Sequence, residues 1–135
     1  MKGVILTSHG KLAEGLLDTL QIFAGDLENV EAICLMPGDD ITEFLEKLKQ
    51  SIANVDTGDG VVVFCDLLFG TPCNCSGTMF KKEGALEKIQ IITGMNLPMV
   101  LEYMSSRRDM DTQDIITTGK NGIIDFNELY KERQS

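Results

Sequence analysis

The sequence predicts an α/β fold, built as a doubly wound, mostly parallel sheet with helices on both faces. Short apolar runs alternate along the chain with segments whose apolar residues follow helical spacing. The runs are hydrophobic throughout, as expected of parallel strands that are buried on both faces. Polar loops containing glycine or proline follow three of the runs. A strand, a turn and a helix repeated in this order indicate right-handed crossovers within one sheet.

The strands are expected where the apolar runs lie. The strongest signal is Gly-Val-Val-Val-Phe-Cys at 60–65, which has the composition of a fully buried parallel strand. The expected strands, in chain order, are 2–7, 30–36, 60–65, 89–93 and a short edge strand at 123–126. Each of the first four is followed by a turn or loop and then by helical spacing.

The helices are expected between the strands. The first begins at Lys11, and the second is capped by Asp40 or Thr42. The third runs from Thr71, as N-cap, to about Lys82, because proline is tolerated in the first helical turn. Two further helices are expected from Pro98 and over 112–118, with a turn at 119–122.

The composition bounds the class of protein. With 135 residues, 43% hydrophobic and 24% charged, the chain is expected to form one domain, 1–126, followed by a polar tail, 127–135. The net charge of −9 argues against nucleic-acid binding, which needs a basic surface. No apolar stretch approaches the roughly 20 residues of a membrane helix. The first residues do not form a signal peptide, so we expect a cytoplasmic protein.

The four cysteines do not indicate a metal or redox site. Cys34 and Cys65 lie in apolar runs, where a thiol behaves as a small hydrophobe. The spacing of Cys73 and Cys75 differs from the usual C-x-x-C pattern. We therefore expect reduced thiols, as is usual in a cytoplasm, and no bound metal.

Chemistry is expected where three strands end in polar loops at one edge of the sheet. The loops are Thr-Ser-His-Gly at 7–10, the segment 66–71, and Gly-Met-Asn at 94–96. The first loop holds His9, the single histidine of the chain. If the first and third strands are neighbours, Asp66 lies beside His9, where a carboxylate fixes the imidazole tautomer and supports positive charge on the ring.

The same edge suits a phosphate group. The helix that starts near Thr71 points its free N–H groups at this space, and Gly70 allows close approach. We assign Gly10, Gly70 and Thr71 to phosphate binding. A nucleophilic imidazole, an orienting carboxylate and a phosphate cradle together favour phosphoryl transfer to and from His9. Two simpler interpretations stay open from the residues alone: Asp66 as a turn residue, and His9 as an imidazole without a task.

Several other functions lack their motifs. The chain has neither G-x-x-x-x-G-K-[ST] nor G-x-G-x-x-G, so nucleotide binding by these loops is not indicated. It also lacks the G-x-S-x-G elbow of α/β-hydrolases. A single histidine without a cluster of ligands argues against a zinc enzyme. We expect no cofactor.

Three segments in order resemble the mannose-type IIA component of the bacterial phosphoenolpyruvate:sugar phosphotransferase system. They are Gly-Val-Ile-Leu-Thr-Ser-His-Gly at 3–10, Phe-Cys-Asp-Leu-Leu-Phe-Gly-Thr-Pro-Cys-Asn at 64–74, and Thr-Gly-Met-Asn-Leu-Pro-Met at 93–99. The resemblance spans about residues 2–126. It implies that His9 is phosphorylated, that Asp66 is its partner, and that Thr71 is the hydroxyl residue before the helix proline. The chain differs from the family pattern at Phe69, where a small residue is common, and at Cys73, where phenylalanine is common.

The resemblance also implies partners. His9 would take a phosphoryl group from HPr and pass it to a separate IIB component, which phosphorylates sugar entering through membrane IIC and IID components. A homodimer is implied, in which the strand at 123–126 crosses to the partner's sheet. The alternatives are the phosphoryl-donor subunit of a dihydroxyacetone kinase, and a non-catalytic regulatory or binding module of the same fold.

Overall fold

Four parallel strands form the sheet at the centre of the protein. The computed structural model describes residues 1–107 and 110–134. The strands are β1 (Gly3–His9), β2 (Val30–Leu35), β3 (Val61–Cys65) and β4 (Ile89–Ile92). Their order across the sheet is β2-β1-β3-β4, and every neighbouring pair is parallel. The predicted parallel sheet is confirmed, and β1 lies beside β3 as the site prediction required.

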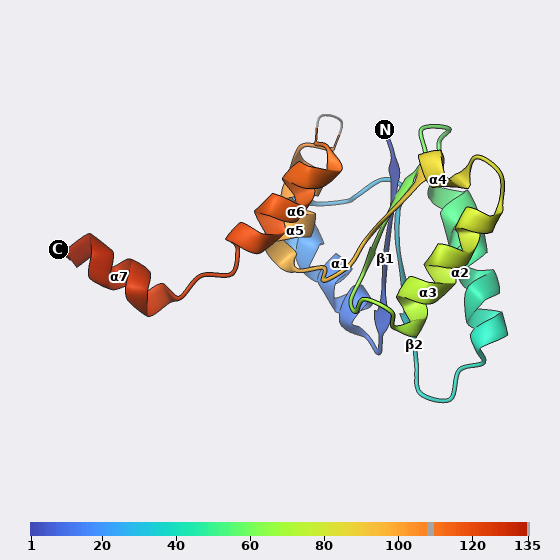
Figure 1. Cartoon of the computed structure of the whole chain (residues 1–135), viewed down its shortest axis with the longest axis horizontal. Coiled ribbons are helices and arrows are strands. Elements are labelled where there is room, and N and C mark those ends of the chain that lie inside the picture. Colours follow the sequence, from blue (N-terminus) through green and yellow to red (C-terminus); the bar gives the residue numbers. More distant parts are fainter. Residues whose placement is uncertain (108–109, 135) are drawn as a thin grey trace.

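Helices cover both faces of the sheet, as predicted (Figure 1). One face packs against α1 (Leu12–Ala24), α5 (Leu97–Ser105) and α6 (Thr112–Asn121), and the other against α2 (Ile41–Val55) and α3 (Thr71–Gly77). The remaining elements are the 3₁₀ turn η1 (Thr78–Lys81), α4 (Ala85–Lys88) and α7 (Phe126–Gln134). Within the described ranges, no helix is both long enough and apolar enough to cross a membrane.

The two layers of core follow from the strand period of two. In β3, Val62 and Phe64 face the α1/α5 layer, while Val61 and Val63 face α2. Phe64 packs edge-on against Tyr103 of α5, with ring centroids 5.7 Å apart. Both layers therefore pack against the same central strands, which fixes the positions of the ends of β1 and β3.

Two expected helix boundaries are corrected by the structure. The helix predicted from Thr71 to about Lys82 changes to 3₁₀ geometry at Thr78. At this junction the Thr78 N–H is shared among the carbonyl oxygens of Asn74, Cys75 and Ser76. The turn predicted at 119–122 is mostly helical, because α6 continues to Asn121. Gly119 has a packing role inside that helix, since a Cβ there would lie 2.6 Å from the terminal methyl group of Met99.

The C-terminal segment is the largest departure from the predicted fold. Residues 123–125 belong to no strand, and α7 begins at Phe126, so the expected edge strand is not formed in the single chain. The segment leads away from the body of the protein, with α7 at its end (Figure 1). Ile123, Ile124 and Phe126 are 74, 61 and 72% exposed. A strand requires a neighbour for its backbone hydrogen bonds, and in the single chain this segment lies beside no strand.

Candidate functional site

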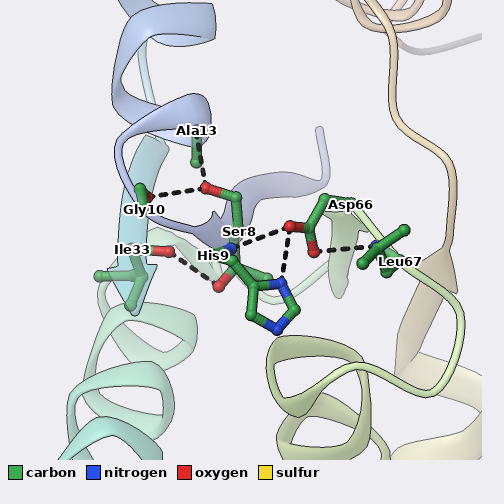
Figure 2. A network of polar contacts seen from close by, with 8 residues as sticks. Ser8, His9, Gly10, Ala13, Ile33, Asp66 and Leu67 are labelled. Atoms are coloured by element: carbon green, nitrogen blue, oxygen red, sulfur yellow. Dashed lines mark hydrogen bonds and ion pairs between the residues drawn. The ribbon is translucent and has the colours of Figure 1, made fainter. Parts of the chain in front are cut away.

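His9 and Asp66 meet where β1 and β3 end. The register pairs Thr7 with Cys65, so the residues that follow in each strand reach the same edge of the sheet. The ring Nδ1 of His9 lies 2.9 Å from Oδ2 of Asp66, and the backbone N–H of His9 donates to the same oxygen, also at 2.9 Å. The predicted proximity of the two residues is confirmed. One carboxylate oxygen thus holds both the backbone and the ring of His9 (Figure 2).

Asp66 is held as an anion. Partial burial acts to raise the pKa of Asp66, but hydrogen bonds from the His9 backbone, the His9 ring and the Leu67 N–H lower it more strongly. The net result is a pKa below the ordinary value of 3.8. The Leu67 N–H donates to Oδ1 at 2.8 Å, so both carboxylate oxygens have partners. The Asp66 side chain is only 11% exposed.

This contact decides which nitrogen of His9 is free. An ionised carboxylate only accepts hydrogen bonds, so Nδ1 carries the ring proton in the neutral imidazole. The lone pair then lies on Nε2, which points away from Asp66 (Figure 2). The His9 side chain is 44% exposed, so another molecule can reach the ring.

Gly70 closes the space under the His9 ring. A Cβ at this position would lie 2.6 Å from Cε1 and 3.4 Å from Nε2 of His9. The ring therefore rests against the backbone just before α3. The first N–H groups of this helix, which begins at the next residue, lack intrahelical partners.

Thr71 is placed differently from the prediction. It is the first residue of α3, and Gly70 is the N-cap, with no side-chain cap bond. The helix starts one residue earlier than expected because the Asn74 N–H donates to the Gly70 carbonyl. Thr71 is half-buried beside Pro72, at the end of the helix that adjoins His9.

Ser8 is a site residue that the sequence interpretation missed. Its hydroxyl is buried, accepts from the Ala13 N–H at 2.8 Å, and donates to the Gly10 carbonyl at 3.1 Å. It thereby takes the capping role at the start of α1, where Lys11 makes no side-chain cap bond. A serine shortly before a helical pattern is the signal that could have indicated this role.

Gly10 turns the chain from β1 into α1. Its φ is +60°, in the left-handed region that favours glycine, and its N–H donates to the Leu35 carbonyl at 2.7 Å. That N–H is therefore already bonded within the protein. Its predicted contact with phosphate stays a prediction.

The third loop supports the site from outside. The Gly94 N–H donates to the Asp66 carbonyl and the Met95 N–H donates to the Cys65 carbonyl, both at 3.1 Å. Asn96 caps α5 by accepting from the Met99 N–H at 3.0 Å. This loop fixes the backbone under Asp66, while the Asn96 side chain serves the helix that follows.

The cysteines are free thiols, and burial, together with Cys73 and Asp66, raises the pKa of Cys65 to about 12. Cys65 therefore stays protonated beneath the site. Within residues 1–107 and 110–134, no cluster of three histidine, cysteine or acidic side chains is arranged to hold a metal ion.

Comparisons with known proteins agree on one family. The family model described as "PTS system fructose IIA component" (EIIA-man) matches residues 3–119. The mannose-specific EIIAB component of Escherichia coli is 30% identical over 125 residues, which cover 89% of this chain and 38% of that protein. The fructose-specific EIIA component of Bacillus subtilis is 25% identical over 120 residues, covering 89% of this chain and 80% of that protein.

A solved structure has the same fold. The PTS IIA protein associated with the fucose utilization operon of Streptococcus pneumoniae superposes with a TM-score of 0.86 at 28% identity, covering 96% of each chain. This chain thus spans well under half of the E. coli relative and nearly all of the streptococcal one. By the family match over most of its length, the chain belongs to the mannose-type IIA components of the sugar phosphotransferase system.

Proposed function

We propose that the protein is a phosphoryl carrier, in which His9 accepts a phosphoryl group from phospho-HPr and passes it to a IIB component during sugar uptake. The observation that carries the proposal is the contact between His9 Nδ1 and Asp66, 2.9 Å long, which leaves the Nε2 lone pair exposed. The family membership supports the same reaction class. With HPr as donor, the proposed reaction would take place in the cytoplasm.

In the proposed mechanism, neutral His9 attacks phosphorus in line through Nε2. The new Nε2–P bond forms as the bond from phosphorus to the donor breaks, and the donor takes that electron pair. Positive charge develops on the His9 ring, and ionised Asp66 stabilises it through the Nδ1 proton. The reverse steps deliver the phosphoryl group to the IIB component.

The phosphoryl oxygens would lie over the start of α3. The lack of a side chain at Gly70 leaves room beside Nε2, since a Cβ there would lie 3.4 Å from that atom. The Thr71 hydroxyl and the first N–H groups of the helix would then balance negative charge on the oxygens. Gly10 would contribute through its backbone conformation, with φ +60°.

Intact-mass analysis tests the carrier role directly. The protein is mixed with phosphoenolpyruvate, enzyme I and HPr, beside a His9→Ala variant as control. We expect the gain of one phosphoryl group that is labile in acid, with no gain in the control. A phosphohistidine assigned by NMR to Nδ1 would contradict the mechanism. No gain in the wild type would point to the dihydroxyacetone system or to a non-catalytic module.

We also propose that the protein is a homodimer in which residues 123–126 pair with the partner's sheet. β4 is an edge of the sheet, and Ile124 is 61% exposed in the single chain. An apolar segment and an open strand edge are both stabilised by pairing across a symmetric interface. The domain would then extend to residue 126, with the polar tail after it.

Sedimentation tests the dimer. An Ile124→Lys variant is expected to sediment as a monomer at concentrations at which the wild type is a dimer. Ile22→Lys is the matched control, because Ile22 is 79% exposed near the end of α1. A dimeric Ile124→Lys protein would contradict strand exchange.

A further inference from the structure

The loop between β3 and α3 contains a backbone conformation that its side chain does not favour. The Gly70 N–H donates to the Leu67 carbonyl at 3.1 Å, which closes a four-residue turn with Phe69 in its third position. Phe69 has φ +64°. Turns that need a positive φ at the third position normally have glycine or asparagine there. For a bulky aromatic residue this conformation is an outlier with a backbone cost.

The position of Asn29 shows how unusual this is. Asn29 and Phe69 are the non-glycine residues with positive φ among those that the structure describes. Asparagine visits this region readily because its short polar side chain bonds locally. Phenylalanine has no such compensation.

Packing within the chain does not compensate either. The Phe69 side chain is 76% exposed, and those of Leu67 and Leu68 are each 62% exposed. The turn itself is fixed, because the Asn74 side-chain amide donates to the Phe69 carbonyl at 3.0 Å. Three consecutive apolar side chains are thus held in solvent on a defined backbone.

These side chains border the reactive atom of His9. Gly70, next to Phe69, contacts the His9 ring through its backbone. A Cβ at Gly70 would also lie 3.4 Å from the Leu67 Cβ, so Leu67 adjoins the same space. A protein that brings its own phosphoryl-bearing group to Nε2 would therefore come close to this turn.

We propose that Phe69, with Leu67 and Leu68, is the contact surface for the phosphocarrier protein that exchanges a phosphoryl group with His9. The inference rests on the proposed carrier function and names the partner's chemistry: an apolar surface surrounding the partner's own phosphoryl-bearing side chain. Phe69 is then a specificity-determining residue, displayed at a backbone cost that only a bound partner offsets. Aromatic residues at the centre of a small contact commonly dominate its binding energy.

The test measures stability and affinity for the partner: we expect stability to be kept or to increase, and affinity to fall. Phe69→Gly removes the phenyl group and also the conformational cost of the positive φ. We expect its thermal midpoint to equal or exceed that of the wild type. We expect its KM for phospho-HPr to rise about tenfold, with a much smaller change in kcat. Phe69→Leu keeps an apolar side chain and is expected to recover most of the lost affinity.

Two controls isolate docking from chemistry. Ile22→Ala removes an equally exposed apolar side chain at the far end of α1 and is expected to leave the KM for phospho-HPr within twofold of the wild type. Phosphoramidate, a small donor that needs no docking surface, supplies the second comparison. The ratio of the rate with phospho-HPr to the rate with phosphoramidate should fall at least about fivefold in Phe69→Gly.

Three outcomes would overturn the inference. In the first, the KM of Phe69→Gly stays within twofold of the wild type. In the second, the thermal midpoint drops by several degrees, which makes the phenyl group a packing residue. In the third, Phe69→Gly dissociates the dimer, which makes the turn a subunit contact. If wild-type His9 accepts phosphate from neither donor, the carrier function itself fails, and this result is distinct from the other three.

Discussion

The two loops that form the site are built on different principles. At the end of β1 and the turn that follows it, which together are the first loop, Ser8 is buried and hydrogen-bonded, and the N–H groups of His9 and Gly10 are both bonded to other strands or loops. In the loop after β3, Asp66 is bonded on both oxygens, but the next three side chains lie in solvent. The first loop fixes His9, the proposed reacting group. The second supplies one anchor, Asp66, and then a surface.

This difference separates two requirements of group transfer between proteins: a precisely placed reacting atom and an exposed contact surface. A reacting nitrogen must be held within a fraction of an ångström, which takes buried polar contacts. A surface that contacts a partner must stay exposed to solvent, so any backbone strain in it destabilises the free protein. Substitutions in the two loops should therefore separate into effects on chemistry and effects on docking.

Gly70→Ala, in the second loop beside the His9 ring, should give the largest effect on chemistry. The new methyl group would lie 2.6 Å from His9 Cε1, so we expect the ring to be displaced from its contact with Asp66. We expect phosphoryl transfer from phospho-HPr to slow about 100-fold, as displacements of about 1 Å do elsewhere. The fold should persist, because Gly70 has φ −73°. Gly15→Ala is the matched control, since nothing lies within 4 Å of its Cβ.

Asp66→Asn tests the anchor itself. The amide can accept a hydrogen bond from His9 but cannot stabilise positive charge on the ring as a carboxylate does. Rapid-quench measurement should show transfer slowed more than about tenfold. An unchanged rate would remove Asp66 from the mechanism and leave it as a structural residue of the turn.

Ser8→Ala tests whether the first loop is held by its buried hydroxyl. The change leaves the Ala13 N–H and the Gly10 carbonyl without the Ser8 partner. We expect a loss of about 2 kcal/mol in the free energy of unfolding, read from urea denaturation. Ser105→Ala, in an exposed position on α5, should cost much less. Equal losses would mean that the Ser8 network does not order the site.

Acid should weaken the contact between Asp66 and His9, and we expect this change in stability to be the smallest of the four effects. The pKa of Asp66 is lower in the folded protein than in the unfolded chain, so its ionisation stabilises the fold above the unfolded pKa, near 4. That contribution is lost as the pH falls through the folded pKa. The wild type should therefore lose more stability than Asp66→Asn between pH 6 and about pH 3. Parallel urea midpoints for the two proteins would contradict this.

The ordered loop could be predicted from the sequence because its placement follows from the strands. The run at 60–65 is apolar throughout, which indicates a central parallel strand, and a central strand ends beside its neighbour. His9 and Asp66 therefore come together from strand order alone. The α/β class, the four parallel strands and most helices follow from the same alternation.

The displayed loop and the C-terminal segment could not be predicted in the same way. The sequence Leu-Leu-Phe-Gly does not indicate a positive φ at Phe69. That φ results from the turn that has to connect β3 to α3, whose positions are fixed by the rest of the fold. Residues 123–126 have a strand-like pattern, but a strand forms only beside another strand. The predicted start of α3, with Thr71 as N-cap, is also wrong by one residue, because a shift of this size does not change the sequence pattern of a helix.

The two hydrogen bonds that Asp66 Oδ2 accepts, from the backbone N–H and from the ring Nδ1 of His9, also have a kinetic consequence. Because the nucleophile is oriented before any partner arrives, no lid has to close and little reorganisation accompanies the chemical step. In the proposed transfer, the encounter between the two proteins would then be the slow event. We expect the second-order rate of transfer to fall as solvent viscosity rises, as it does for reactions controlled by diffusion.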